Sequence, residues 1–365
     1  METGADADSP RVWMLLGHKT GDNAQVRSLA AALGWPAQAR RCAYRATELL
    51  TNRLFGPTLA GLDPAKSDAL GPPWPDLVIS SGRRNEPVAR WIRQASGGRC
   101  KLVHLGRPWS APKNFDLVIT TPQYSLAPAD NVVQVALPLH SITPEKLRAA
   151  VRQWEARLSD LPAPRTAVLI GGNSGSFLMT ADRVRQIRAA AKRLAVASGG
   201  SLLLTDSART PAEARDELFA PLAIPHHGFR WGTAGDNPYL GYLALADQFI
   251  VTGDSVSMVA EACATAKPVY LYHPSAHPMR LPDAEAIRPD WQRPAWYGWR
   301  ALSHRLAMGW GPIRMRRDVP ALLQGLVDSG RAAWLGGAPP ASPGAGSDDL
   351  AVAVSRVRAL LGPSA

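Results

Sequence analysis

Cysteine is scarce in this chain. Its 365 residues include only three, at Cys42, Cys100 and Cys263. No two of them form a Cys-x-x-Cys pair, and their wide spacing gives no disulfide framework. The pattern is typical of small buried side chains in a reducing compartment.

Targeting and membrane-spanning segments are also missing from the sequence. Residues 1–8 contain neither a basic segment nor an apolar run, so we expect no signal peptide. No 18 apolar residues follow one another anywhere, so we expect no transmembrane helix. We therefore predict a cytoplasmic protein, and peripheral attachment at the inner membrane stays open.

Three common ligand-binding patterns are absent as well. The chain has no GxxxxGK[ST] phosphate loop and no GxGxxG dinucleotide fingerprint. Two histidine pairs, His226-His227 and His273 with His277, lack a clear third ligand. Asp6-Ala7-Asp8 has the form of a metal motif but lies in an expected disordered tail. We predict no metal site and no cofactor.

The composition has an excess of positive charge. Lysine and arginine total 41 against 30 acidic residues, which gives a net charge of +11 and an isoelectric point near 10.0. Such an excess favours an anionic partner, namely a nucleotide, a phospholipid surface or nucleic acid. No nucleic-acid-binding motif accompanies the charge, so nucleic acid is an unlikely partner. Genome base bias toward arginine is an equally simple explanation. Nothing in the sequence indicates an oligomeric state.

Short apolar runs alternate with segments of helical periodicity along most of the chain. This alternation predicts parallel sheets covered by helices on both faces. The proline-rich stretch Leu161-Pro162-Ala163-Pro164-Arg165 predicts a domain boundary. We expect an α/β protein with two Rossmann-like, doubly wound domains that face a cleft. The predicted parts are a disordered tail (1–10), a first domain (11–161), a second domain (162–335), a flexible linker (336–348) and a C-terminal helix (349–365).

The most informative junction is Thr252-Gly253-Asp254-Ser255-Val256-Ser257, which joins a buried strand to a helix. If Ser255 and Ser257 open this helix, their hydroxyls and the first free N–H groups can hold a pyrophosphate. Glu261 follows Ser257 by about one helical turn, where a carboxylate can accept hydrogen bonds from ribose. Gly253 allows close approach of the backbone. An ordinary capped helix with a surface glutamate is the alternative interpretation.

A second junction of this type is Gly171-Gly172-Asn173-Ser174-Gly175-Ser176. Gly172, Asn173 and Ser174 follow a strand, and glycines with hydroxyls let the backbone approach a diphosphate or a sugar. A tight turn between strand and helix explains the same residues.

In the first domain the corresponding junction is Gly17-His18-Lys19-Thr20-Gly21-Asp22. Asp22 is placed to act as a general base on an acceptor hydroxyl, and His18 is a second candidate base. Asp22 as a plain helix cap is the alternative. Arg83 and Arg84 end another strand, where they suit an anionic acceptor or a solvated turn.

Residues 277–317 are rich in arginine and contain Trp291, Trp296, Trp299 and Trp310. This combination suits a membrane interface or single-stranded nucleic acid. Tryptophans that pack on the domain and stack with arginine are the alternative.

Four of these elements resemble the Elm-type (elongated-mitochondria) fission family in its bacterial branch. They are HKTGDNAQ at 18–25, SSGRR at 80–84, GGNSGS at 171–176 and VTGDSVSMVAEA at 251–262. The resemblance implies similarity to GT-B glycosyltransferases, which bind a nucleotide-sugar between two Rossmann-like domains without a metal. By position it implies donor contacts from Ser255, Ser257 and Glu261, and it makes Asp22 the candidate base.

The resemblance therefore implies a glycosyltransferase that moves a sugar from a nucleotide-sugar donor to a cell-envelope or lipid-linked acceptor. Its acceptor would be an anionic lipid or an envelope glycan. The alternative is a non-catalytic, membrane-associated adaptor of the same family. Nucleotide binding distinguishes the two.

Overall fold

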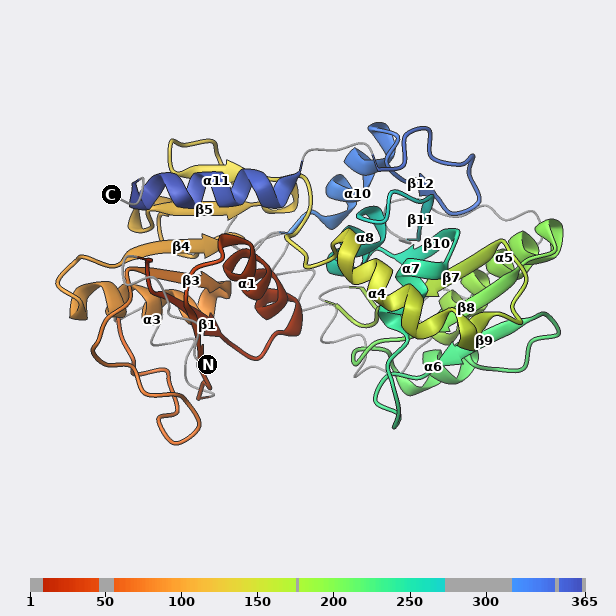
Figure 1. The fold of residues 1–365 in the computed structure, drawn as a ribbon, viewed down its shortest axis with the longest axis horizontal. Helices are drawn as coiled ribbons and strands as arrows, with labels where there is room; N and C mark the ends of the chain where they lie inside the picture. Colours follow the sequence, from red (N-terminus) through yellow and green to blue (C-terminus); the bar gives the residue numbers. More distant parts are fainter. Residues whose placement is uncertain (1–8, 46–55, 175–176, 273–316, 345–347, 363–365) are drawn as a thin grey trace. The chain divides into compact units, whose positions relative to one another are not determined.

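The computed structural model describes residues 9–45, 56–174, 177–272, 317–344 and 348–362. These residues form two compact units, which are coloured along the chain in Figure 1. Unit 1 consists of residues 1–141 and 347–365, and unit 2 consists of residues 142–346. The predicted Arg/Trp segment 277–317 lies outside the described residues except for its last residue. So do residues 1–8 of the predicted tail.

Unit 1 is built on a six-stranded sheet whose described strand pairs are all parallel. The strand order is β2-β1-β3-β4-β5-β6. β1 and β3 are buried along their whole length, as their apolar runs predict. The strands are β1 (Val12–Leu16), β2 (Ala37–Arg41), β3 (Leu77–Ser81), β4 (Lys101–Leu105), β5 (Leu117–Thr120) and β6 (Val132–Gln134).

Helices cover both faces of the unit 1 sheet. α1 (Thr20–Leu33) and α11 (Asp349–Leu361) share one apolar core, and α3 (Gly82–Ala95) contributes to the core on the opposite face. Leu29 and Ile92 are fully buried in these two cores, and each such side chain stabilises the fold by about 1.5–3 kcal/mol. Three-residue 3-10 helices, η1 (Pro112–Asn114) and η2 (Pro122–Tyr124), complete the unit.

Unit 2 contains a second parallel six-stranded sheet, of order β12-β11-β10-β7-β8-β9. Counted along the chain this is the 3-2-1-4-5-6 order of a doubly wound nucleotide-binding domain. The strands are β7 (Arg165–Leu169), β8 (Ser201–Thr205), β9 (His226–Phe229), β10 (Gln248–Thr252), β11 (Val269–Tyr272) and β12 (Ala333–Trp334).

The helices of unit 2 include two that share an apolar core, α5 (Ala181–Ser198) and α6 (Ala212–Leu218). The others are α4 (Pro144–Trp154), η3 (Ala156–Leu158), α7 (Tyr239–Leu245), α8 (Val256–Cys263) and α10 (Val319–Asp328). In the part of the chain that the structure describes, no helix is long and apolar enough to cross a membrane.

The division between the units differs from the predicted boundary at residues 161–165. The structure divides the chain at residues 141 and 142, so α4 belongs to unit 2. Trp154 at the end of α4 is buried against α7, where a Cβ at Gly241 would overlap the Trp154 ring. This close packing holds α4 on unit 2. A proline-rich break in a helical pattern is therefore not sufficient to place a domain boundary.

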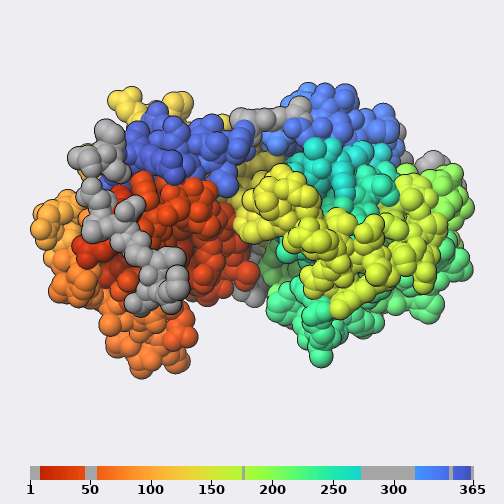
Figure 2. All heavy atoms as spheres, in the orientation of Figure 1, coloured from red at the N-terminus to blue at the C-terminus, as the bar shows by residue number. Residues whose placement is uncertain are grey.

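The predicted C-terminal helix packs on unit 1, where α11 lies beside α1 (Figure 2). The Asp349 carboxylate at its start accepts hydrogen bonds from the backbone N–H groups of Ala136 (3.1 Å) and Leu137 (2.9 Å). The last residues of the chain thus complete the domain with which the chain begins.

Each sheet has one point where the strand order reverses, between β1 and β3 in unit 1 and between β7 and β10 in unit 2. Open α/β sheets bind ligands outside the carboxyl ends of the strands at such a switch point. The candidate catalytic and donor-binding residues lie in segments that follow β1, β7 or β10, and Arg83 and Arg84 follow β3. The α/β class with two Rossmann-like domains is confirmed, and the cleft stays a prediction.

Candidate functional site

The switch point of unit 2 presents free backbone donors at the start of α8. Ser255 occupies the N-cap position, and its hydroxyl makes no capping hydrogen bond. The first bond of the helix runs from Val259 N–H to the Ser255 carbonyl (3.1 Å). Within the described chain the N–H groups of Val256, Ser257 and Met258 therefore have no acceptor. Together with the helix dipole they favour a bound anion.

The side chains around these donors have unused hydrogen-bonding capacity. Ser255 and Ser257 are half-buried, and neither hydroxyl has a hydrogen-bond partner among the described residues. Gly253 is engaged differently, because its N–H donates to the carbonyl of Tyr272 (2.9 Å) and extends the sheet. The two serines, but not the Gly253 N–H, are thus available to a ligand.

Glu261 lies on the second turn of α8 and faces α7. Its Oε2 accepts a hydrogen bond from the hydroxyl of Tyr239, the first residue of α7. Burial raises the pKa of the Glu261 carboxyl, and the Tyr239 hydroxyl opposes that rise. Burial and the neighbouring Glu261 also raise the pKa of Tyr239 well above its usual value, so Tyr239 remains a donor. Glu261 is therefore an oriented carboxylate with its second oxygen unused by the described protein.

The glycine loop after β7 differs from the prediction. Its N–H groups already have protein acceptors: Gly172 donates to Asp254 Oδ2 (2.8 Å), Asn173 to the Arg209 carbonyl (3.1 Å) and Ser174 to the Phe177 carbonyl (3.0 Å). The loop also opens no helix, since α5 starts only at Ala181. The turn itself therefore uses these three N–H groups, and the role of Gly172, Asn173 and Ser174 toward a diphosphate or a sugar stays a prediction.

Close packing explains the two glycines of this loop. A Cβ at Gly171 would overlap the carboxylate of Asp254, and a Cβ at Gly172 would overlap the backbone of Arg209. The loops that follow β7, β8 and β10 therefore touch at the switch point, and the glycines let them do so.

Asp254 joins these three loops, a role that the sequence did not indicate. Its side chain is fully buried, and Oδ2 accepts from Gly172 N–H (2.8 Å) and from Arg209 Nη2 (3.0 Å). Its Oδ1 has no partner among the described residues. Burial raises the pKa of the Asp254 carboxyl, and the Arg209 charge opposes that rise. A hydrogen bond from the Thr252 hydroxyl opposes it as well, so several polar groups at the switch point stabilise this buried carboxylate.

Arg209 is the second residue that the motifs missed. It follows β8 and donates to the Asn173 carbonyl (3.1 Å) as well as to Asp254. Its side chain is 41% exposed, so the guanidinium also faces solvent at the carboxyl edge of the sheet. The sequence feature that could have identified Arg209 is its position directly after β8, the strand next to β7. The loops that follow parallel strands lie at the same edge of the sheet, so a residue there can reach the switch point.

In unit 1 the structure excludes the capping role for Asp22. α1 starts at Thr20 with Lys19 as its N-cap, and Asp22 lies in the first turn of the helix. Its Oδ2 lies 3.0 Å from the position of a Cβ at Gly82, the first residue of α3. Asp22 is half-buried and thus brings a carboxylate to the β1/β3 switch point.

His18 lies beside a strong donor. Its Nδ1 is 3.2 Å from Nη1 of Arg84, which has only hydrogens to offer, so Nδ1 accepts and the ring proton sits on Nε2. Partial burial lowers the pKa of His18, with Arg84 and Lys19 acting in the same direction and Asp22 opposing them. In this arrangement His18 is a hydrogen-bond donor toward solvent, which leaves Asp22 as the better base.

Two asparagines that the sequence analysis did not single out fix these loops. Asn23 Oδ1 accepts from Gly17 N–H (2.9 Å), and its Nδ2 donates back to the Gly17 carbonyl (2.8 Å). Asn85 Nδ2 donates to the carbonyls of Leu15 and Ser81, each at 3.0 Å, and so ties β1 to β3. The unit 1 switch point is therefore held rigidly by side chains of α1 and α3.

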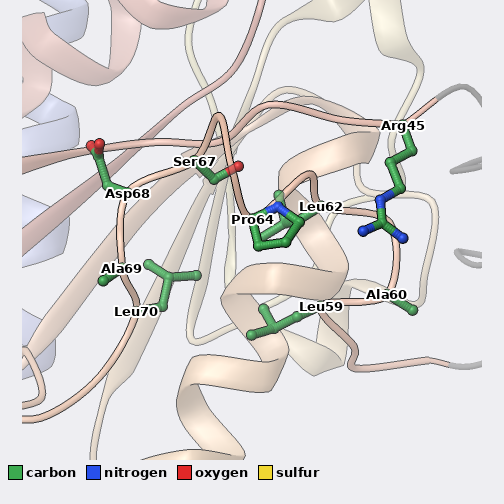
Figure 3. A pocket seen from close by; sticks show the side chains of 9 residues that line it. All are labelled: Arg45, Leu59, Ala60, Leu62, Pro64, Ser67, Asp68, Ala69 and Leu70. Atoms are coloured by element: carbon green, nitrogen blue, oxygen red, sulfur yellow. The ribbon is translucent and has the colours of Figure 1, made fainter.

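A cavity of about 430 Å³ lies elsewhere in unit 1 (Figure 3). It is lined by the segment after β2, and no candidate site residue is among its lining residues. Two of its polar side chains bond the backbone, since the Ser67 hydroxyl accepts from Ala43 N–H and the Asp68 carboxylate accepts from Arg41 N–H. Among the described residues no cluster of His, Cys, Asp or Glu has the form of a metal site.

The fold and these two switch points define an α/β protein of two doubly wound units. The chain belongs to the mitochondrial fission ELM1 family, whose model matches residues 20–286. Mitochondrial fission protein ELM1 of Arabidopsis thaliana is 32% identical over 219 residues, which cover 54% of this chain. The match spans 51%, about half, of the plant protein.

Solved structures with a similar fold include two bacterial enzymes. UDP-GlcNAc 2-epimerase from Neisseria meningitidis, solved with UDP-GlcNAc, is 12% identical with a TM-score of 0.42 and covers 87% of this chain and 99% of its own. ADP-heptose LPS heptosyltransferase II of E. coli is 14% identical with a TM-score of 0.41 and covers 72% of this chain and 86% of its own.

Proposed function

We propose that unit 2 binds a nucleotide-sugar at the β7/β10 switch point and that the protein transfers the sugar to an acceptor hydroxyl. The observation that supports it most is the start of α8, where three N–H groups and two serine hydroxyls have no partner among the described residues. A diphosphate supplies the acceptor oxygens that these groups lack. Glu261, one turn further and oriented by Tyr239, would accept a hydrogen bond from ribose.

The transferase activity is the further part of the proposal. It is supported by the resemblance of the motifs to the Elm-type family, which implies similarity to GT-B glycosyltransferases, and by Asp22 at the unit 1 switch point. Asp22 would take the proton of the acceptor hydroxyl, and the donors at the start of α8 would stabilise the leaving diphosphate. An envelope or lipid-linked acceptor, a cytoplasmic location and peripheral contact with the inner membrane belong to this proposal.

A titration of the full-length protein tests the donor site. UDP, GDP, ADP, CDP and CMP, with their common sugar conjugates, are added while binding is followed by calorimetry and by the melting temperature, which a native-state ligand raises. We expect one nucleotide to bind, and we expect Glu261→Gln to weaken that binding. Glu155→Gln, which alters an exposed glutamate at the end of α4, is the matched control. A folded protein that binds none of these ligands would overturn the proposal.

A second function has one observation in its favour, namely the name of the plant relative, a mitochondrial fission protein. In this alternative the protein is a membrane-associated adaptor without enzymatic activity. It predicts co-sedimentation with anionic vesicles that neither a nucleotide nor Glu261→Gln changes.

A further inference from the structure

Arg209 combines two features that a purely structural arginine does not need. Its guanidinium is fixed by the Asn173 carbonyl (3.1 Å) and Asp254 Oδ2 (3.0 Å), yet its side chain is 41% exposed. These contacts occupy two of the five N–H donors, and the other three have no hydrogen-bond acceptor among the described residues. The arginine is therefore held in one orientation and still has donors to offer.

Its position places those donors at the carboxyl edge of the unit 2 sheet. Arg209 follows β8, which lies next to β7, and Asp254 follows β10 on the other side of β7. The ion pair between Arg209 and Asp254 therefore reaches across the switch point itself. Asp254 also lies directly before Ser255, the N-cap of α8.

Asp254 is arranged to hold Arg209 in this place. Its side chain is fully buried, Gly172 N–H fixes Oδ2 from one side, and the absence of a Cβ at Gly171 makes room for the carboxylate. A buried carboxylate keeps its charge only beside a partner, so Asp254 and Arg209 depend on each other. The Oδ1 of Asp254 has no hydrogen-bond partner among the described residues.

We propose that Arg209 binds the diphosphate of the nucleotide in unit 2 and that Asp254 is the residue that positions it. This inference rests on the proposed donor site and deepens it. It assigns the recognition of the diphosphate to two elements, the start of α8 and Arg209. An arginine fork matches phosphate oxygens in a way that a lysine does not.

The test compares ligands that differ in phosphate number. Binding of nucleoside, nucleoside monophosphate and nucleoside diphosphate is measured by calorimetry, with inorganic pyrophosphate as a fourth probe. We expect Arg209→Ala to weaken the diphosphate and pyrophosphate by at least about tenfold and to leave the nucleoside unchanged. Arg209→Lys should restore part of the loss. Arg193→Ala, an exposed arginine on α5, should change nothing.

Asp254→Asn tests the positioning role. It keeps the size of the side chain and removes its charge, so the same selective loss of diphosphate affinity is expected, with nucleoside affinity retained. Equal weakening of all four probes would show a structural role and overturn the assignment of Asp254. If diphosphates bind and Arg209→Ala does not affect them, Arg209 is not their ligand, although the donor site stands. If pyrophosphate alone binds in an Arg209-dependent way, the nucleotide proposal fails and the anion site stands.

Discussion

The hydroxyl of Tyr239 donates a hydrogen bond to Oε2 of Glu261, which connects the first residue of α7 to the second turn of α8. Both residues are half-buried, and burial raises the pKa of each. The contact holds a carboxylate beside the helix start that carries the free N–H groups. The geometry of the proposed ribose contact therefore depends on a residue 22 positions away in the sequence.

Tyr239→Phe should destabilise the protein more at pH 8 than at pH 5. The pKa of Glu261 is higher in the folded state than in the unfolded state. Between these two pKa values the native state keeps a proton that the unfolded state loses, so the free energy of unfolding falls as the pH rises from one to the other. Removing the hydroxyl raises the folded pKa further and deepens the loss, by about 1–3 kcal/mol at pH 8. Urea unfolding at both pH values measures it.

Tyr270→Phe is the control for that experiment, because the Tyr270 hydroxyl makes no hydrogen bond to a described residue. Its effect should be small and equal at the two pH values. An effect of Tyr239→Phe that is also independent of pH would mean that Glu261 is not the group concerned.

Glu261→Gln separates binding from stability. The amide removes a carboxylate whose burial is unfavourable, so the free energy of unfolding at pH 7.5 should stay constant or rise. Nucleotide affinity should fall about 10- to 100-fold, since a charged hydrogen bond is worth about 1.5–3 kcal/mol. Affinity and stability that fall together would argue for a structural glutamate. Glu155→Gln should alter neither.

Gly172→Ala should be strongly destabilising. The added Cβ would overlap the carbonyl group of Arg209, and backbone cannot move aside as a flexible side chain does. We expect a loss of about 3 kcal/mol, at the upper end for an overpacked site. In Gly325→Ala the new Cβ has open space within α10, so a gain of about 0.5–1 kcal/mol is expected. Chemical denaturation measures the free energy of unfolding, which should fall in Gly172→Ala and rise in Gly325→Ala. An unchanged free energy of unfolding in Gly172→Ala would contradict the close contact between the two loops.

Local pattern was sufficient for most of the elements. The short apolar runs at 101–105, 201–205 and 269–272 are of the kind that predicts a parallel sheet covered on both faces, and they form β4, β8 and β11. β2 was missed since Ala37–Arg41 is a mostly exposed edge strand with no apolar run. β12 is only two residues long, and α10 has Pro320 in its first turn, which hides a helical pattern.

The candidate site was predictable to the extent that it is local. Ser255, Ser257 and Glu261 lie on one helix, so their spacing alone gives their relation. Arg209 and Asp254 come together only because β8, β7 and β10 are neighbours, and strand order is a property of the whole domain. For the same reason the sequence could not show that the N–H groups of Gly172, Asn173 and Ser174 donate hydrogen bonds to acceptors within the protein.

Asp22→Asn should lower turnover and leave donor binding unchanged. Asp22 belongs to unit 1 and lies at its switch point, whereas the proposed nucleotide contacts belong to unit 2. Loss of a general base typically costs about 10²–10⁴-fold in rate. Release of the nucleoside diphosphate from the bound nucleotide-sugar, with a solubilised bacterial lipid extract as acceptor, measures turnover, and calorimetry measures affinity.

Asp130→Asn, which alters an exposed aspartate of the same unit, is the control. Unchanged turnover in Asp22→Asn would remove Asp22 as the base and leave the acceptor proton to another group of unit 1. The next candidate in unit 1 is His18, whose Nδ1 is already in contact with Arg84 Nη1. A pH–rate profile of Asp22→Asn would show whether the His18 imidazole acts as the base once this contact is broken.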